Sequence, residues 1–177
     1  MFLETPDAIV RMMEEADIAA VLAIQAACYT AIVPESADSL LAKLRASPAT
    51  CFIAVRAGAP LAYLIALPWR FASPPRLNAA HCRLPPEPDC LYLHDLAVAP
   101  PARASGAGRE LVEMFLRCLH DRQLGRATLV AIQDSAPYWA RYGFRAVPPS
   151  PSLQAKLASY GEDVQYMARP AGPATGA

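Results

Sequence analysis

The sequence has no excess of charge of either sign, because sixteen lysine and arginine residues balance sixteen aspartate and glutamate residues. A balanced chain creates no global field that attracts nucleic acid or an anionic membrane surface, so neither is an expected partner. The sequence also lacks a run of about 18 uninterrupted apolar residues. Residues 1–11 carry an acidic pair where a signal peptide has a basic stretch. We therefore expect a cytoplasmic protein that does not span a membrane.

The cysteines form no metal-binding or disulfide pattern. They are odd in number and widely spaced, and they include no C-x-x-C pair of the kind found in zinc sites. They are Cys28, Cys51, Cys82, Cys90 and Cys118. We therefore predict no metal site and interpret the thiols as reduced and mostly buried.

Length and composition are those of one globular domain. Of the 177 residues 54% are hydrophobic and 18% charged, which is enough for a sizeable core. Most of the eighteen prolines cluster in residues 68–88, 100–101, 148–151 and from Pro170 onward, where they mark breaks between elements. We expect one domain over residues 1–169. The tail over 170–177 has small residues with nothing to bury, so we expect it to be disordered.

Hydrophobic periodicity divides the domain into interleaved strands and helices. The predicted strands are 8–12, 51–55, 61–67, 91–98, 128–132, 144–147 and a final edge strand at 164–168. The predicted helices are 17–30, capped by Asp17, then 38–46, 106–119 and 135–142. Residues 51–67 read as a hairpin, 68–89 as a long loop, and 91–132 as a strand, helix, strand crossover. This order predicts an α/β sandwich with mostly antiparallel strands.

A run of small residues leads from the strand at 91–98 into the helix at 106–119. Two prolines stop the strand, and Gly106 and Gly108 then open the helix. The first N–H groups of a helix are unpaired and carry partial positive charge, and small residues let a phosphate approach them. Arg103 and Arg109 add positive charge beside this turn. The segment therefore suits a pyrophosphate.

Two common nucleotide motifs do not fit this segment. A P-loop requires lysine and then serine or threonine after its last glycine, whereas Arg109 and Glu110 follow Gly108. A Rossmann turn requires a third glycine, and Leu111 occupies that position.

The motif Arg103-Ala104-Ser105-Gly106-Ala107-Gly108, preceded by a strand ending in Leu-Ala-Val, resembles the phosphate-binding motif of the Gcn5-related N-acetyltransferases, the GNAT superfamily. Downstream, the segment 135–144 is similar to that family's next motif, an aromatic pair on a short helix that ends in Gly-Phe. Two motifs in the right order are far more specific than either alone. The structural alternative is a glycine-start helix that merely packs closely.

The resemblance implies a three-layer α/β/α sandwich with a mixed, mostly antiparallel sheet that splays at its centre. Acetyl-CoA would lie in the gap between the strands at 91–98 and 128–132. The backbone of Leu96, Ala97 and Val98 would pair with pantetheine amides. Amides of the segment from Arg103 to Gly108 would hold the pyrophosphate, and Arg109 would add charge beside them. The family usually has glycine at the position of Ala104, where a methyl group is tolerable if φ stays negative.

His94 is the predicted proton acceptor. Strand alternation places Tyr92, His94, Leu96 and Val98 on one face, and Leu93, Asp95 and Ala97 on the other. The segment 91–98 is similar to the strand on which arylalkylamine acetyltransferases carry catalytic histidines. Tyr92 either assists or only shapes the pocket. The alternative for His94 is a core histidine hydrogen-bonded to a carbonyl or carboxylate.

The matching proton donor is not evident in the sequence. The family's usual general acid is a tyrosine four residues before the glycine of Gly-Phe, and Trp139 occupies that position. Tyr138 is the neighbouring candidate, although the family usually has a buried phenylalanine there, and core packing of Tyr138 and Tyr142 is the alternative. A thiol with a pKa of roughly 8.5 also leaves readily as thiolate.

The resulting hypothesis is an N-acetyltransferase that transfers the acetyl group of acetyl-CoA to a primary amine by direct attack in a ternary complex. No cysteine has a neighbouring base, so an acyl-enzyme is not expected. The acceptor is a small-molecule amine or a protein N-terminus, and its identity and the acyl chain length are open. The alternative function is a non-catalytic acyl-CoA sensor or interaction module. The chain is a monomer or a homodimer.

Overall fold

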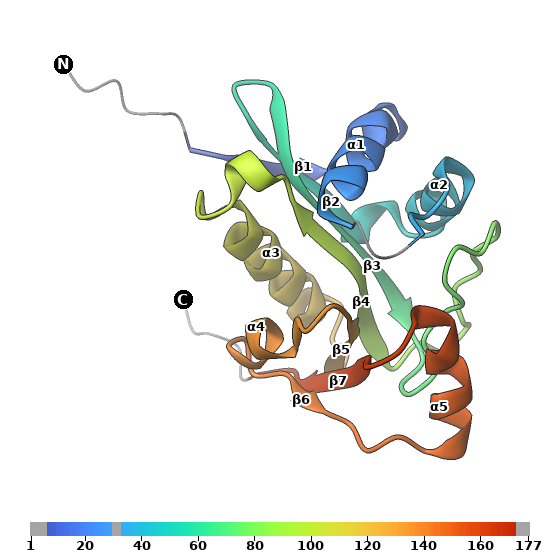
Figure 1. Cartoon of the computed structure of the whole chain (residues 1–177). Coiled ribbons are helices and arrows are strands. Elements are labelled where there is room, and N and C mark those ends of the chain that lie inside the picture. The colour runs from blue at the N-terminus through green and yellow to red at the C-terminus, as the bar shows by residue number, and fades with distance from the viewer. Residues whose placement is uncertain (1–6, 30–32, 173–177) are drawn as a thin grey trace.

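The computed structural model describes residues 7–29 and 33–172. Within these ranges the strands form one seven-stranded sheet in the order β1-β2-β3-β4-β5-β7-β6 (Figure 1). The strands are β1 (Ile9–Met12), β2 (Cys51–Arg56), β3 (Ala59–Trp69), β4 (Cys90–Val98), β5 (Arg126–Ala131), β6 (Arg145–Ala146) and β7 (Gln165–Pro170). The helices are α1 (Ile18–Cys28), α2 (Ala37–Ala46), α3 (Ala107–Asp121), α4 (Ala136–Ala140) and α5 (Pro151–Leu157).

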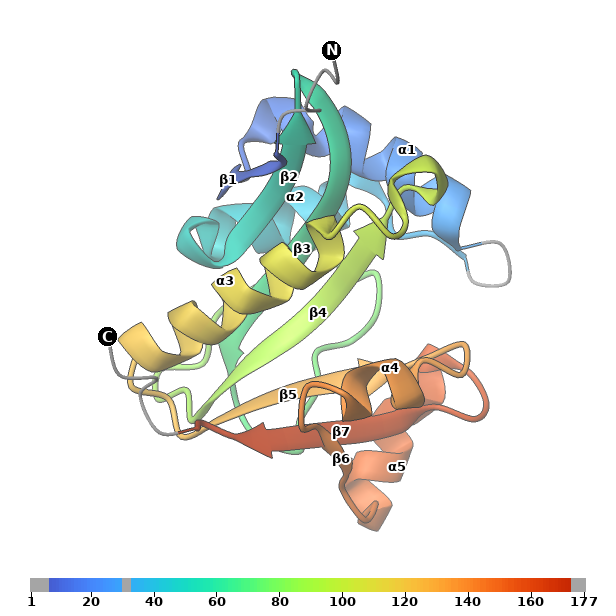
Figure 2. The same ribbon diagram turned by 90° about the vertical axis from the view of Figure 1, so that its left-hand side faces the viewer.

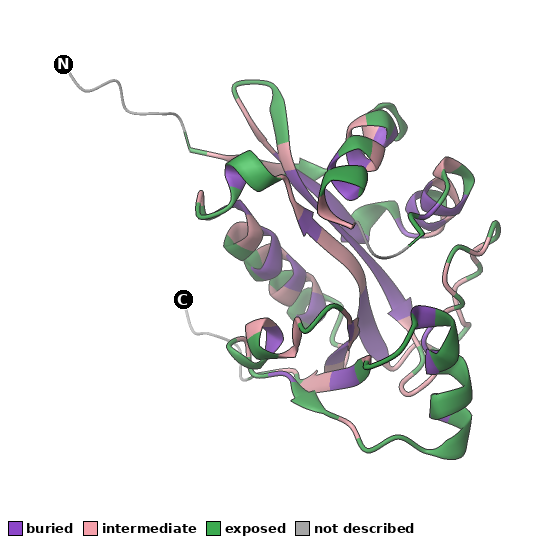
Figure 3. Cartoon of the chain, viewed as in Figure 1, coloured by how far each residue is buried: buried purple, intermediate pink, exposed green. Residues whose placement is uncertain are grey.

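Helices cover both faces of this sheet, which confirms the predicted three-layer sandwich. Helix α3 packs on one face in a cluster around Leu111, Val112 and Phe115, because its apolar residues recur at helical spacing. Helices α1 and α2 pack on the other face, around Val21 and Leu40 (Figure 2). The central strands between these layers are largely buried, and the longest buried run is in β3 (Figure 3). None of the helices in the described ranges is long and apolar enough to cross a bilayer.

The sheet splays between β4 and β5. These two strands are parallel and pair only from Leu91–Leu93 to residues 127–129, after which they diverge (Figure 2). All the other strand pairs are antiparallel, including the predicted β2–β3 hairpin. The prediction of a mixed, centrally splayed sheet is therefore confirmed.

A β-bulge in β4 overturns the predicted alternation of its side chains. Ile65 of β3 is opposite Asp95 while Ala66 is opposite Leu93, so His94 is the extra residue. The side chains that pack toward α3 are Leu91, Leu93, Leu96 and Val98. Ala97 belongs to the opposite cluster, and Asp95 bonds to Tyr63 of that cluster. One inserted residue thus puts His94 and Asp95 on the same side of the sheet.

The structure differs from three local predictions. Asp17 is at the N-cap position of α1, as predicted, but its side chain does not cap the helix and instead accepts bonds from Arg11 and from the Glu14 amide, each at 2.8 Å. Strand β7 is not an edge strand, because the short β6 pairs with its outer side. Helix α5 was missed, since it begins among prolines and has only two buried side chains, Leu153 and Leu157. Of the predicted tail, Pro170 ends β7, and residues 173–177 lie outside the described ranges.

Candidate active site

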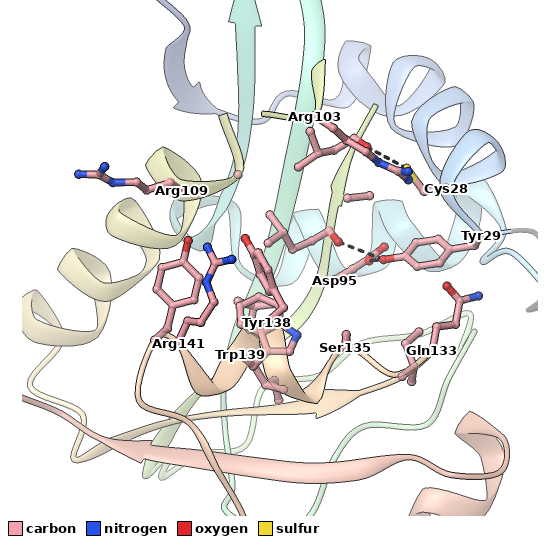
Figure 4. Close-up of a pocket in the computed structure, with 18 of the residues that line it drawn as sticks. Cys28, Tyr29, Asp95, Arg103, Arg109, Gln133, Ser135, Tyr138, Trp139 and Arg141 are labelled. Carbon is pink, nitrogen blue, oxygen red and sulfur yellow. Dashed lines mark hydrogen bonds between the residues drawn. The ribbon is translucent and has the colours of Figure 1, made fainter. Parts of the chain in front are cut away.

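A cavity of about 560 Å³ fills the gap between the diverging strands β4 and β5. Its walls come from the end of α1, the segment before α3, and α4 (Figure 4). Eight of the ten predicted cofactor-binding residues line it, namely Leu96, Ala97, Val98, Arg103, Ala104, Gly106, Gly108 and Arg109. The two others do not: Ala107 is buried in the core, and the Ser105 hydroxyl accepts a 3.3 Å bond from the Ala107 amide.

The N-terminus of α3 opens onto this cavity. The first backbone bond of the helix runs from the Glu110 amide to the Gly106 carbonyl at 3.0 Å, so the preceding amides have no partner within the helix. Gly106 has a φ of 87°, a conformation that suits glycine. At Gly108 a Cβ would lie 3.1 Å from Val98 Cγ2, a tight contact, so any larger residue would require Val98 or the helix to shift. The residues present therefore fit a pyrophosphate.

Ala104 does not have the negative φ that was expected. Its φ is 66°, in the left-handed region. In this region the Cβ of any residue other than glycine lies too close to a backbone carbonyl oxygen, which destabilises the conformation by roughly 1–2 kcal/mol. The family's usual glycine at this position would adopt the same turn without that cost.

The arginines near the cavity have different orientations. The Arg109 guanidinium points away from the other labelled side chains and pairs with Glu113 at 2.9 Å on the helix surface (Figure 4). Arg103 is exposed at the cavity rim. Arg141, for which no role was predicted, also lines the cavity, with its guanidinium 5.3 Å from the centre of the Tyr138 ring. Two arginines on opposite walls thus supply positive charge for an anion.

Backbone groups of β4 face the cavity beyond the bulge. The Ala99 amide donates to the Leu61 carbonyl of β3 at 2.8 Å. Because the backbone groups of successive residues point to opposite sides of a strand, the N–H and C=O groups of Leu96 and Val98 point away from β3. Their carbonyls accept bonds from the Tyr29 hydroxyl and the Cys28 thiol, each at 3.1 Å. Their N–H groups face a side where the described residues provide no strand partner.

His94 is held by Glu35, a residue that sequence reasoning missed. His94 Nε2 lies 2.9 Å from Glu35 Oε1, and the histidine side chain is 2% exposed. A carboxylate only accepts hydrogen bonds, so Nε2 carries the proton in this pair. The other ring nitrogen, Nδ1, is buried and has no partner among the described residues. A neutral His94 ring therefore keeps its free lone pair on Nδ1.

The Glu35 carboxylate is the centre of a buried polar cluster. Its Oε1 also accepts a 3.0 Å bond from the Asn78 amide and lies 3.5 Å from Lys43 Nζ. Burial raises the pKa of Glu35, but the interactions with His94, Lys43 and the Asn78 amide outweigh it and lower the pKa to about 2. No sequence signal identifies Glu35, because its partners are distant in sequence.

Tyr92 lines neither this cavity nor the small cavity beside Glu35. Its side chain is 1% exposed, and its hydroxyl lies 3.1 Å from the Tyr160 hydroxyl. Asp95 accepts a 2.6 Å bond from the Tyr29 hydroxyl (Figure 4). It accepts a second bond of 2.6 Å from the Tyr63 hydroxyl. The Tyr92 ring packs beside His94, with their centroids 5.9 Å apart, and does not itself line either cavity.

The two aromatic residues of α4 both reach the cavity but differ in how deeply they are buried. Both Tyr138 and Trp139 line the cavity, but Trp139 is only 7% exposed and belongs to the α3 cluster. The Tyr138 hydroxyl approaches the α3 N-terminus, 3.5 Å from where a Cβ on Gly108 would be. Burial, and then its interaction with Tyr142, raises the pKa of Tyr138. The hydroxyl therefore keeps its proton at neutral pH.

Comparison with known proteins identifies the family. A profile of the acetyltransferase (GNAT) family matches residues 18–144, which is more than half of the chain. The chain therefore belongs to the GNAT acetyltransferase family, as its motifs indicated. No curated protein matches the sequence significantly.

Solved structures share the fold at low sequence identity. Ard1 from Thermoplasma volcanium is 16% identical with a TM-score of 0.71, covering 93% of this chain and 98% of its own. The acetyltransferase yncA from Salmonella typhimurium, determined with its cofactor acetyl-CoA, is 17% identical with a TM-score of 0.67, covering 97% and 98%. The GNAT-like decarboxylase GphF, in complex with isobutyryl-CoA, is 18% identical with a TM-score of 0.71, covering 93% and 100%.

The strain at Ala104 leads to a prediction about stability. We expect Ala104→Gly to raise the free energy of unfolding by about 0.5–1 kcal/mol, because steric relief exceeds the added entropy of the unfolded chain. Urea denaturation measures the change. Ala155→Gly, on an exposed position of α5, is the matched control and should lower the same quantity by a similar amount. A loss of stability in Ala104→Gly would contradict the strain assigned to this turn.

The Glu35 cluster predicts a specific acid sensitivity. Because the pKa of Glu35 is lowered from 4.5 to about 2 on folding, the carboxylate stabilises the protein above pH 4.5. This contribution is lost as the pH falls toward 2, at about 1.4 kcal/mol per pH unit. We therefore expect the free energy of unfolding to depend less steeply on pH in Glu35→Gln than in the wild-type protein. Urea denaturation between pH 5 and the lowest pH at which the protein is folded measures this dependence. If the free energy of unfolding depended on pH equally in the wild-type protein and in Glu35→Gln, the lowered pKa of Glu35 would be excluded.

Proposed function

We propose that this protein is an acetyl-CoA-dependent N-acetyltransferase that acetylates a primary amine by direct attack in a ternary complex. The observation that carries the proposal is the buried, unpartnered Nδ1 of His94 beside the gap between β4 and β5. Family membership and the shape of the gap support the donor. The acceptor is a small-molecule amine or a protein N-terminus.

The cavity offers separate positions for the parts of acetyl-CoA. Amides at the α3 N-terminus, with Arg103 and Arg141 nearby, suit the pyrophosphate. The cavity-facing backbone groups of Leu96 and Val98 suit the pantetheine amides and are available to polarise a carbonyl. Acetyl-CoA would supply a thioester, which is open to attack by an amine.

His94 would remove the proton that an attacking amine must lose. Its Nε2–H donates to Glu35, which fixes the ring and directs the lone pair to Nδ1. The carboxylate also stabilises the imidazolium that forms when Nδ1 takes a proton. Glu35 thus acts as a positioning residue for His94.

Tyr138 is the candidate proton donor to the leaving thiolate. Its hydroxyl lies in the cavity next to Val98 and Gly108, and its raised pKa keeps it protonated. Trp139, at the family's usual tyrosine position, is packed into the core and has no hydroxyl to donate.

A non-catalytic acyl-CoA sensor is the second candidate, motivated by Trp139. Release of free thiol from acetyl-CoA mixed with a panel of amines separates the two functions. Turnover of any amine supports the enzyme. Tight acetyl-CoA binding without turnover on the whole panel supports the sensor.

The role of His94 is testable by substitution. We expect His94→Gln to lower kcat by roughly 100-fold or more on the best amine of the panel and to change the pH profile. Steady-state kinetics across pH measures both effects. His120→Gln, an exposed histidine on α3, is the control. Unaltered kinetics in His94→Gln would remove this residue from the mechanism.

Substitution also tests Tyr138. We expect Tyr138→Phe to lower kcat by about 10-fold at every pH of the assay, because the raised pKa of Tyr138 keeps its hydroxyl protonated throughout and the leaving thiolate loses this donor. The KM for acetyl-CoA should change little, because the ring remains. A change in KM alone, with kcat intact, would show that Tyr138 only shapes the cavity.

A further inference from the structure

A second, smaller cavity opens on the same gap from the other face of the sheet. Its wall comes from α1, the segment before α2, Leu77, Tyr160 and the diverging strands β4 and β5. Helices α1 and α2 pack on this face, opposite to α3. The residues that line both cavities are Tyr29, His94, Asp95, Val130 and Ile132. The two cavities therefore meet where β4 and β5 diverge.

The proposed ternary complex leaves this face of the sheet to the acceptor. In that complex acetyl-CoA would occupy the large cavity, with its pyrophosphate at the N-terminus of α3 and its acyl end extending along β4 toward His94. An amine that attacks the acyl carbon without displacing the donor has to approach from the face of α1 and α2. The small cavity lies on that approach.

Most polar side chains in the wall of the small cavity are bonded to other protein groups. The Gln25 amide exchanges two hydrogen bonds with the backbone of Glu35, at 3.0 and 3.2 Å. The Glu35 carboxylate is bonded to His94 through Oε1, at 2.9 Å. The Tyr29 hydroxyl donates to Asp95 at 2.6 Å. These groups therefore have little hydrogen-bonding capacity left for a ligand.

The remaining polar groups of the wall add no further binding capacity. The Tyr160 hydroxyl donates to the Pro75 carbonyl and lies 3.1 Å from the Tyr92 hydroxyl. Glu35 Oε2 and His94 Nδ1 have no partner among the described residues, but both are buried and add no polar surface to the small cavity. The rest of the wall is apolar and comes from Val33, Pro34, Leu77, Val130 and Ile132. A group that enters this cavity therefore makes mainly apolar contacts.

The volume of the small cavity limits the size of what enters. It measures about 50 Å³. A water-sized group needs roughly 10–15 Å³ of cavity volume, so there is room for about four non-hydrogen atoms. A hydroxyl or a second ammonium group there would lose its hydrogen bonds to water without gaining a protein partner, which lowers affinity by roughly tenfold or more. The cavity therefore selects short apolar groups.

We propose that the small cavity takes the substituent of the acceptor amine, and that this substituent is a short alkyl group. This inference rests on the proposed function and adds the substrate class, an alkyl monoamine. The amine nitrogen lies where the two cavities meet, and its chain of about three or four carbons points away from the donor. Polyamines, amino alcohols and protein N-termini are excluded, because each carries a polar group next to or beyond the reacting amine.

Binding tests this subsite independently of turnover. NMR titration of the full-length protein saturated with CoA compares propylammonium with 2-hydroxyethylammonium, which has the same charge and the same number of non-hydrogen atoms. We expect propylammonium to bind at least about 10-fold more tightly, because the hydroxyl finds no partner in the cavity. Equal affinities, tighter binding of 2-hydroxyethylammonium, or no binding of propylammonium would overturn the inference.

Substitution locates the selectivity. Leu77→Asn keeps a side chain of similar size in the wall and offers the hydroxyl a partner, so the two affinities should come within about threefold of each other. Leu124→Asn is the control, because Leu124 is also partly buried but lies outside the small cavity, and this variant should keep the full preference.

A full preference for propylammonium in folded Leu77→Asn would assign the alkyl site elsewhere and overturn the inference. Circular dichroism checks that each variant is folded. The wild-type comparison stands if Leu77→Asn is not folded.

Turnover separates this inference from the proposed function. Thiol release with propylamine and much less with ethanolamine supports both. Equal release with the two amines, or release with ethanolamine or a peptide N-terminus and not with propylamine, keeps the acetyltransferase and overturns the alkyl subsite. Selective propylammonium binding without release on any amine supports the subsite and overturns the proposed function.

Discussion

Beyond Leu93, the backbone of β4 has β3 on one side and no strand on the other. Buried peptide groups need hydrogen-bond partners, so the unpaired edge has to be satisfied by something other than a neighbouring strand. The Tyr29 hydroxyl and the Cys28 thiol donate hydrogen bonds to two groups of this edge, the carbonyls of Leu96 and Val98. The remaining N–H groups face the gap. An open strand edge inside a folded domain is thus both a cost to stability and a template for an extended ligand.

The bulge at His94 directs the chemistry of this edge. The extra residue puts His94 and Asp95 on the same side of the sheet, toward α1 and α2. Asp95 is satisfied by two tyrosine hydroxyls, while His94 meets Glu35. Without the bulge, the strand would alternate regularly and place these neighbours on opposite faces. A backbone irregularity therefore decides which side chains are available at the end of the gap.

At the other end of the gap, α3 packs closely against β4, and the turn before α3 includes residues with positive φ. Gly108 favours the close approach of α3 to Val98, because a Cβ there would be only 3.1 Å from Val98 Cγ2, and Gly106 provides the left-handed residue before the helix. Ala104 adopts a left-handed conformation that its methyl group disfavours. The turn keeps this strain while it holds the helix N-terminus open toward the cavity, where unpaired amides suit an anion.

Local patterns were sufficient for much of the fold. Period-2 and period-3.6 hydrophobicity located the β2–β3 hairpin, the β4–α3–β5 crossover and helices α1 to α3, because these signals come from residues close in sequence. The glycine motif likewise indicated the end of the cavity at which α3 begins. Helix α5 was missed because its two buried residues are too few to establish a period.

The sequence by itself determined the family, the layered sheet and the segment suited to the cofactor, since each is encoded in contiguous residues. Only the tertiary structure decided the environment of His94. Its partner Glu35 is 59 residues away, Lys43 and Asn78 reach the same carboxylate from separate elements, and the bulge depends on pairing with β3. Charges and lone pairs act through space over a few ångströms, and the distances that set them exist only after the chain has folded.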